Sequence, residues 1–232
     1  MTARPLSTGV FTAAAILVIS CCSFTQTAPA PGSPARADLD RLLASVTVVD
    51  SRGNVPGYDR DCRAGRACVF GPAWSDDTTA PGGHDGCDTR NNVLAKQLRE
   101  VRLRPGTHDC VVEHGILDDP YTGKQITFTK QDAGAVQIDH VYPLAAAWDM
   151  GAAAWPPELR ARYANDLDIT LLAVDGAQNQ NKSDKTPADW LPPNHAYRCY
   201  FAGKYLTAAQ HYGLPLTRAD HAALTTVATT CP

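Results

Sequence analysis

The chain has 232 residues, of which 44% are hydrophobic and 19% are charged, and this composition excludes a disordered or fibrous protein. The length is sufficient for one domain with a substantial core. The formal net charge is −3, which excludes the basic surplus typical of a sequence-specific DNA-binding protein. Any contact with nucleic acid must therefore be local and must depend on a metal ion.

The beginning of the chain indicates an export signal followed by a tether. Residues 10–20 form an apolar run that is too short to span a bilayer and fits the central region of a signal peptide. Residues 25–37 are rich in Pro, Ala, Ser and Thr, which favours a disordered tether. We therefore expect residues 1–37 to be signal and tether and residues 38–232 to be a single domain. Without residues 1–37 the chain has 19 basic and 24 acidic residues, a net charge of −5.

Two processing routes remain open for this segment. The run Val-Ile-Ser-Cys at 18–21 resembles a lipobox, which would leave a lipid anchor on Cys21 and so attach the protein to a membrane. Cleavage after the small residues Ala30 or Ala37 would instead release a soluble protein. Both routes predict a secreted or extracytoplasmic protein.

Hydrophobic periodicity predicts a mixed α+β fold. In the first part of the domain we expect helices over 38–45 and 88–101, and strands over 46–49, 110–117, 124–129 and 135–141. The segment Asp-Pro-Tyr-Thr-Gly at 119–123 has hairpin-turn chemistry. Further along we expect a strand over 169–174, a turn with a short helix within 179–190, and longer helices over 144–155, 156–164, 194–212 and 217–229.

Six cysteines remain after the first 37 residues, and an even number in an exported chain predicts disulfides. Local spacing favours the pairs Cys62–Cys68, Cys87–Cys110 and Cys199–Cys231, one of 15 possible pairings. A zinc site is the alternative, and the lack of a Cys-x-x-Cys pair argues against it.

The chemistry of the chain is concentrated where the strand over 135–141 ends. Asp139 is a hard oxygen ligand suited to Mg²⁺, and His140 beside it is a titratable nitrogen. Neighbours in a regular strand point to opposite faces. Both can serve one site only if the strand ends or bulges there, and Pro143 makes such an ending plausible.

A second group of polar residues follows the strand over 169–174. Asn179 offers a neutral oxygen ligand, and Lys182 lies three residues further on the same helical face, where it could hold a phosphate oxygen. Each residue alone has a structural explanation: a hydrogen-bonded turn, a helix cap or a solvated lysine. The ordered combination is much rarer than its parts.

Together these segments resemble the HNH endonuclease family, also called His-Me finger or ββα-metal nucleases. The similarity is greatest to exported bacterial members related to the C-terminal domain of GmrSD-type restriction endonucleases, and it covers roughly residues 50–200. The matching segments are 86–91, 119–123, 138–144, 147–148, 151–152, 165–166, 171–174 and 179–184. The resemblance implies a ββα-metal core with added helices and disulfides.

The resemblance also implies roles for individual residues. Asp139 and Asn179 match metal ligands for one Mg²⁺ or Mn²⁺ ion, and His140 matches the general base that activates water. Lys182 matches a basic residue near the phosphate, and Arg90 is a second candidate for that task. The chain departs from the usual pattern at Thr170, where many relatives carry Asn, and at Asn181, where a small residue such as Ser is usual.

The resemblance thus implies a metal-dependent endonuclease that hydrolyses phosphodiester bonds, in DNA in preference to RNA, and leaves 5′-phosphate and 3′-hydroxyl ends. We expect a monomer without a small-molecule cofactor. Two alternatives remain open: a non-catalytic cell-envelope binding protein on an HNH scaffold, and a metallohydrolase acting on another phosphoester. The remaining histidines and the four tryptophans are expected to be structural or surface residues.

Overall fold

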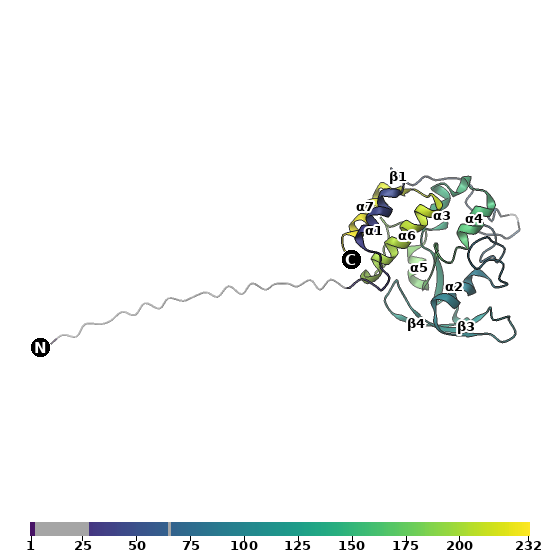
Figure 1. Ribbon diagram of the computed structural model, residues 1–232, viewed down its shortest axis with the longest axis horizontal. Coiled ribbons are helices and arrows are strands. Elements are labelled where there is room, and N and C mark those ends of the chain that lie inside the picture. Colours follow the sequence, from purple (N-terminus) through teal and green to yellow (C-terminus); the bar gives the residue numbers. More distant parts are fainter. Residues whose placement is uncertain (3–27, 65) are drawn as a thin grey trace.

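The computed structural model describes residues 1–2, 28–64 and 66–232, and within them it confirms the α+β class (Figure 1). The strands form three small sheets: parallel β1–β7, antiparallel β2–β3–β4 and antiparallel β5–β6. The helices are α1 Arg36–Ser45, α2 Thr89–Gln97, α3 Leu144–Asp149, α4 Pro157–Ala164, α5 Gly176–Lys182, α6 Arg198–Tyr212 and α7 Arg218–Ala228. The strands are β1 Val48–Val49, β2 Arg99–Leu103, β3 Val112–Asp118, β4 Gln125–Thr129, β5 Val136–His140, β6 Leu171–Asp175 and β7 Leu216–Thr217.

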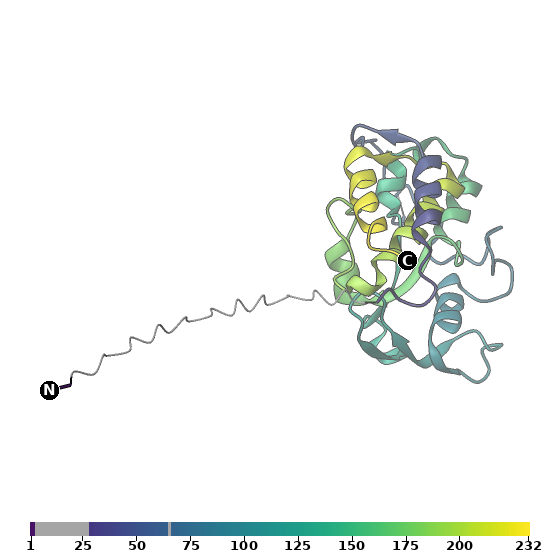
Figure 2. The same ribbon diagram turned by 60° about the vertical axis from the view of Figure 1, so that its left-hand side comes forward.

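The two ends of the domain meet on the helical side. Helices α1, α6 and α7 stand together, away from the β3–β4 hairpin, in both views (Figure 1, Figure 2). The Arg36 amide donates to the Pro232 carbonyl at 2.6 Å, and the Ala30 amide donates to the Ala196 carbonyl at 2.7 Å. Residues on the N-terminal side of the boundary expected at residue 38 thus already contact the domain. The apolar run at 10–20 and Cys21 lie outside the described residues.

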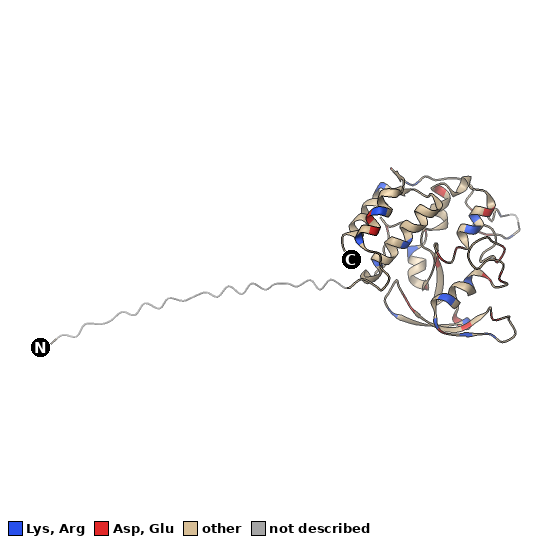
Figure 3. Cartoon of the chain, in the orientation of Figure 1, with Lys and Arg blue, Asp and Glu red and all other residues tan. Residues whose placement is uncertain are grey.

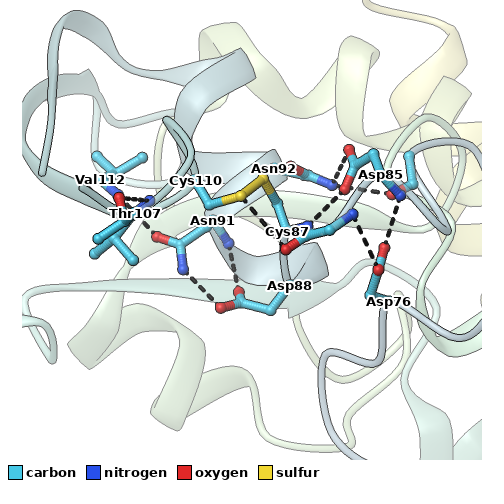
Figure 4. Close-up of a disulfide and its surroundings, with 12 residues drawn as sticks. Asp76, Asp85, Cys87, Asp88, Asn91, Asn92, Thr107, Cys110 and Val112 are labelled. Carbon is cyan, nitrogen blue, oxygen red and sulfur yellow. Dashed lines mark hydrogen bonds between the residues drawn. A yellow bond between two sulfur atoms is a disulfide. The ribbon is translucent and has the colours of Figure 1, made fainter. Parts of the chain in front are cut away.

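All three predicted disulfides are present: Cys62–Cys68, Cys87–Cys110 and Cys199–Cys231. Figure 4 shows how the second one joins the start of α2 to the β2–β3 connection. Beside it Asp88 caps α2 by accepting from the Asn91 amide at 2.8 Å. The Asn91 side chain then accepts from the Val112 amide at 3.0 Å. The bridge and the cap together fix α2 against β3.

The β3–β4 hairpin has the turn that the sequence predicts at 119–123. The Gly123 amide donates to the Asp119 carbonyl at 2.9 Å, and Gly123 has a φ of +73°, which a glycine adopts without strain. The Asp119 carboxylate accepts from the Thr122 amide within the turn and from the Asp175 amide at the end of β6, at 2.7 and 2.8 Å. The hairpin tip is thereby attached to the β5–β6 sheet.

The antiparallel pair β5–β6 lies between two hydrophobic cores, and α5 follows it directly. Val136 and Ile138 of β5, with Leu171 and Ala173 of β6, face a smaller core that α2 and β3 complete. The other face of β6 belongs to a larger core built mainly from α1, α3, α6 and α7. Burial on both faces explains why residues 171–174 are continuously apolar. The order strand, strand, helix over these residues agrees with the ββα expectation.

Two helices end well before the positions that the sequence predicts. The helix expected over 88–101 ends at Gln97, because residues 99–103 instead form β2 and pair with β3. The helix expected over 144–155 ends at Asp149, and Gly151, with a φ of +137°, separates it from a short 3₁₀ turn. Strand β7 has no counterpart among the predicted elements.

In the view of Figure 3, charged residues of both signs are scattered over the described part of the domain. This agrees with the small net charge of −3. Among the described residues, no helix combines the length and the apolar character that a membrane span requires.

Candidate active site

A cavity of about 560 Å³ opens at the end of β5. Its walls come from the loop over residues 52–60, the start of α3 and the end of α5. Polar side chains on these walls include Arg52, Arg60, Asp139, His140, Asn179 and Ser183. The cavity therefore contains three of the predicted site residues, and the fourth and fifth, Lys182 and Arg90, are not part of its lining.

Asp139 and His140 reach this cavity although they point to opposite faces of the sheet. Asp139 pairs with Leu172 of β6 and His140 with Leu171, so the regular alternation of β5 is maintained. They share the cavity because β5 ends at His140, as Pro143 predicts. The ending of the strand, without a bulge, brings the two groups to one site.

The His140 ring is held by one hydrogen bond and one stacking contact. Its Nε2 lies 2.8 Å from the Ala164 carbonyl oxygen, and its ring is nearly parallel to that of Trp74, at 13° and 5.9 Å between centroids. A carbonyl oxygen only accepts, so Nε2 must carry the hydrogen, and Nδ1 keeps its lone pair. Burial lowers the pKa of His140 to about 3, with a further lowering by Arg60 and an opposing effect of the Ala164 bond. The ring is therefore neutral and has a free acceptor nitrogen.

The Asp139 carboxylate is buried and receives a donor on each oxygen. Lys182 Nζ donates to Oδ1 at 2.9 Å, and the Tyr121 hydroxyl donates to Oδ2 at 2.5 Å. Lys182 also donates to the His140 carbonyl at 3.0 Å, and its side chain is only 1% exposed. Burial raises the pKa of Asp139, whereas Lys182 and Tyr121 act in the opposite direction. Lys182 thus fixes the end of β5 from within and does not reach solvent.

Helix α5 presents Asn179 to the cavity. The Asn179 amide nitrogen donates to the Gln137 side chain at 3.0 Å, which leaves the Asn179 side-chain oxygen as an available acceptor. Two residues further on, the side-chain oxygen of Asn181 accepts from the Trp190 indole at 3.1 Å. This bond gives a structural reason for Asn at a position where the resemblance leads us to expect a small residue.

Arg90 and Thr170 have structural contacts. Arg90, in α2, donates from Nη2 to the carbonyls of Ala133 and Val136, at 2.9 and 2.8 Å. These carbonyls lie at the start of β5, at the end of the strand opposite to His140. The Thr170 hydroxyl lies 2.8 Å from the Tyr163 carbonyl and is fully buried. It fixes the turn before β6, where the resemblance leads us to expect Asn.

The structure brings several residues to the site that sequence reasoning did not select. Tyr121 arrives on the hairpin tip, and the motif at 119–123 was the signal that could have identified it. Arg52 crosses the cavity wall and binds Asp149 and Asp184, at 2.7 and 3.1 Å. Neither Arg52 nor Arg60 lies in a recognisable motif, because both come from an irregular loop, 84 and 76 residues before the first residue of β5.

The donors in the cavity determine which metal the site can accept. Among the described residues no group of three or more His, Cys, Asp or Glu side chains could hold a metal ion. Asp139 and Asn179 offer oxygen atoms, and a carboxylate has about four acceptor positions, of which Lys182 and Tyr121 use two. Such a sparse oxygen set fits Mg²⁺, which is commonly bound through one or two carboxylates plus water and substrate phosphate. It does not fit zinc, which favours His and Cys.

Comparison with known proteins places this geometry in a family. Residues 88–227 match the model of the GmrSD restriction endonuclease C-terminal domain, and this range contains β5, β6 and α5. An uncharacterized secreted protein of Arthroderma benhamiae is 35% identical over 202 residues, covering 87% of this chain and 88% of the relative. No solved structure matches the chain. The relative is fungal, so the narrower expectation of a bacterial subgroup stays a prediction. The chain belongs to the family of GmrSD restriction endonuclease C-terminal domains.

Proposed function

We propose that the protein is a metal-dependent endonuclease that hydrolyses phosphodiester bonds, in DNA in preference to RNA. The observation that carries the proposal is the state of His140: a neutral imidazole with Nε2 committed to a carbonyl and Nδ1 free, in the cavity that also contains Asp139 and Asn179. A nitrogen of this kind can accept a proton from water. Membership in a restriction-endonuclease family supports the choice of substrate.

In this proposal Asp139 and Asn179 would hold one Mg²⁺ or Mn²⁺ ion. The ion, when bound, would polarise the scissile phosphate and offset its charge. Lys182 and Tyr121 orient the Asp139 carboxylate and favour its ionised form, against the effect of burial. The buried position of Lys182 and the backbone contacts of Arg90 lead us to assign positioning roles to both of them and not a phosphate contact.

The reaction follows from the position of the base. His140 Nδ1 removes a proton from a water molecule, and the water oxygen forms a bond to phosphorus. The bond from phosphorus to the 3′ oxygen breaks, and that oxygen takes up a proton from solvent, while the His140 imidazolium returns its proton to solvent. The products are a 5′-phosphate and a 3′-hydroxyl, so atoms and charge balance with water as the only co-reactant. The Ala164 carbonyl stabilises the imidazolium that forms, since it accepts the Nε2 hydrogen at 2.8 Å.

We further propose that the enzyme acts outside the cytoplasm. Three disulfides within one domain favour an oxidising compartment. The similar fungal protein is described as secreted. Anchoring through a lipid on Cys21 and release after cleavage stay alternatives that mass spectrometry of the mature N-terminus distinguishes.

The test is cleavage of supercoiled plasmid and of single-stranded DNA and RNA, with Mg²⁺, with Mn²⁺ and with EDTA. Wild type should cleave only with a divalent ion. Asp139→Ala and Asn179→Ala should lose activity and recover part of it at high metal concentration, because each variant weakens metal binding. Activity that persists in EDTA would contradict the proposal.

A second function is favoured by the ion pair between Asp139 and Lys182. A lysine already neutralises the carboxylate that would hold the metal, which suits a non-catalytic binding protein on the same scaffold. Binding of nucleic acid by wild type without cleavage under any metal condition would support this function.

A further inference from the structure

The cavity contains one arginine whose charge is not neutralised. Five basic residues lie in or near the site, and four have defined partners among the described residues. Arg52 binds two carboxylates, Lys182 binds Asp139, Lys185 donates to the Asn181 carbonyl, and Arg90 donates to two carbonyls. Arg60 lines the cavity, and within the described part of the chain it has neither a salt bridge nor a hydrogen bond.

Arg60 packs over the Trp74 ring, which stacks on the proposed base His140. Its guanidinium carbon is 6.0 Å from the centroid of the Trp74 ring, and Trp74 stacks in turn on His140. A cation–π contact orients a guanidinium without cancelling its charge. The influence of Arg60 on the pKa of both His140 and Asp139 agrees with its closeness to the two groups.

The described backbone around this stack is held by a hydrogen bond and a disulfide, and Trp74 has an unusual conformation. Just before Arg60, the Asp59 carbonyl accepts from the Val69 amide at 2.9 Å, and the Cys62–Cys68 disulfide closes the segment between them. Trp74 has a φ of +59°, a left-handed conformation that a bulky residue adopts only where its surroundings hold it. Two segments are thus constrained in the arrangement that places Arg60 above Trp74.

We propose that Arg60 binds a non-bridging oxygen of the scissile phosphodiester. This inference rests on the proposed function and names the residue that recognises the substrate's phosphate. Phosphodiester hydrolysis increases negative charge on the phosphoryl oxygens, and a guanidinium matches two of these oxygens with its planar pair of donors. The absence of a competing carboxylate leaves that pair available. Arg60 therefore supplies the cationic contact that the buried Lys182 does not make.

The test separates phosphate binding from catalysis. Binding of a fluorescein-labelled single-stranded DNA 12-mer is measured in EDTA by fluorescence anisotropy over a series of salt concentrations. Arg60→Gln should raise Kd on the order of 10–100-fold. It should also reduce the slope of log Kd against log salt by about one counterion. Arg60→Lys should keep the salt slope but lose part of the affinity, because it retains the charge and loses the planar donor pair.

The matched control is Arg63→Gln. Arg63 lies three residues further along the same loop, is 87% exposed on its side chain and does not line the cavity. Its replacement should change neither Kd nor the salt slope. All three variants should unfold within about 4 °C of wild type, since Arg60 makes only the cation–π contact with Trp74 and Arg63 is on the surface.

The outcomes distinguish this inference from the proposed function. Wild-type Kd and salt slope in Arg60→Gln, or no DNA binding by wild type, would overturn the role of Arg60 even if the protein cleaves DNA. A lower affinity and a reduced slope in Arg60→Gln, together with no cleavage by wild type, would keep Arg60 as the phosphate contact and remove only the catalytic proposal.

Discussion

The buried ion pair between Lys182 and Asp139 gives a stability prediction that can be worked from the structure. The two side chains are 1% and 5% exposed, and their charged atoms lie 2.9 Å apart. Removal of one partner leaves the other charge buried without compensation, which typically costs about 3–5 kcal/mol. Lys182→Met should therefore lower the free energy of unfolding by about 3–5 kcal/mol. Urea denaturation at pH 7 in EDTA measures this change.

A double variant tests whether the loss comes from the pair itself. In Asp139→Asn/Lys182→Met neither charge remains, so the unfolding free energy should return to within about 2 kcal/mol of wild type. The control is Arg99→Met, which breaks a pair of similar length, 2.7 Å to Asp118, whose side chains are 50% and 61% exposed. Its cost should be below about 1 kcal/mol. A cost below about 1 kcal/mol for Lys182→Met, or additive losses in the double variant, would show that an unpaired buried charge is not the cause.

Three further predictions concern the surroundings of the site. The pKa of His140 is about 3 in the folded chain and about 6.5 in the unfolded chain, so the unfolded chain binds a proton that the folded chain does not, and stability falls as pH drops below about 6.5. Between pH 7.5 and 5 in EDTA, the unfolding free energy of wild type should fall by about 2 kcal/mol more than that of His140→Asn. Equal losses would contradict the burial of a neutral His140. Gly176→Ala should destabilise the protein by about 1–3 kcal/mol, because its Cβ would lie 2.1 Å from the Gly134 carbonyl oxygen. Gly134→Ala is the control, since a Cβ there meets nothing within 4 Å. Similar shifts of the unfolding temperature in both variants would contradict this packing. Replacing Cys87 and Cys110 by Ala should lower the free energy of unfolding by about 3 kcal/mol, since their bridge closes a loop with a sequence separation of 23. Urea denaturation measures this change, and an unchanged midpoint would show that the bridge does not stabilise the fold.

Much of the fold could be predicted because local signals and tertiary contacts agree. The proline at 157 begins α4, and Gly213, with a φ of +64°, ends α6, as their sequence positions indicate. The three disulfides follow local spacing. The helix expected over 88–101 was wrong beyond Gln97, because pairing with β3 outweighs the helical periodicity of residues 98–101.

The candidate site was predicted only in part. The ending of β5 places Asp139 and His140 together, and α5 adds Asn179, so residues from one local stretch of chain could be identified. The side-chain partners of these residues could not be identified from the sequence. Lys182 turns inward to a buried carboxylate, which no pattern of spacing distinguishes from a lysine that points to solvent. Arg60 comes from a distant loop, and only the folded chain places it over Trp74.

The role of His140 as the base is tested by the cleavage rate of His140→Ala beside wild type, with Mn²⁺ binding of both proteins followed by calorimetry. The variant should lose about 10²–10⁴-fold in the rate of DNA cleavage while it binds Mn²⁺ as wild type does, because the base is lost and the proposed ligands Asp139 and Asn179 remain. Added metal should not restore the rate. Cleavage by His140→Ala at the wild-type rate would contradict the account, because the proton would then be removed elsewhere.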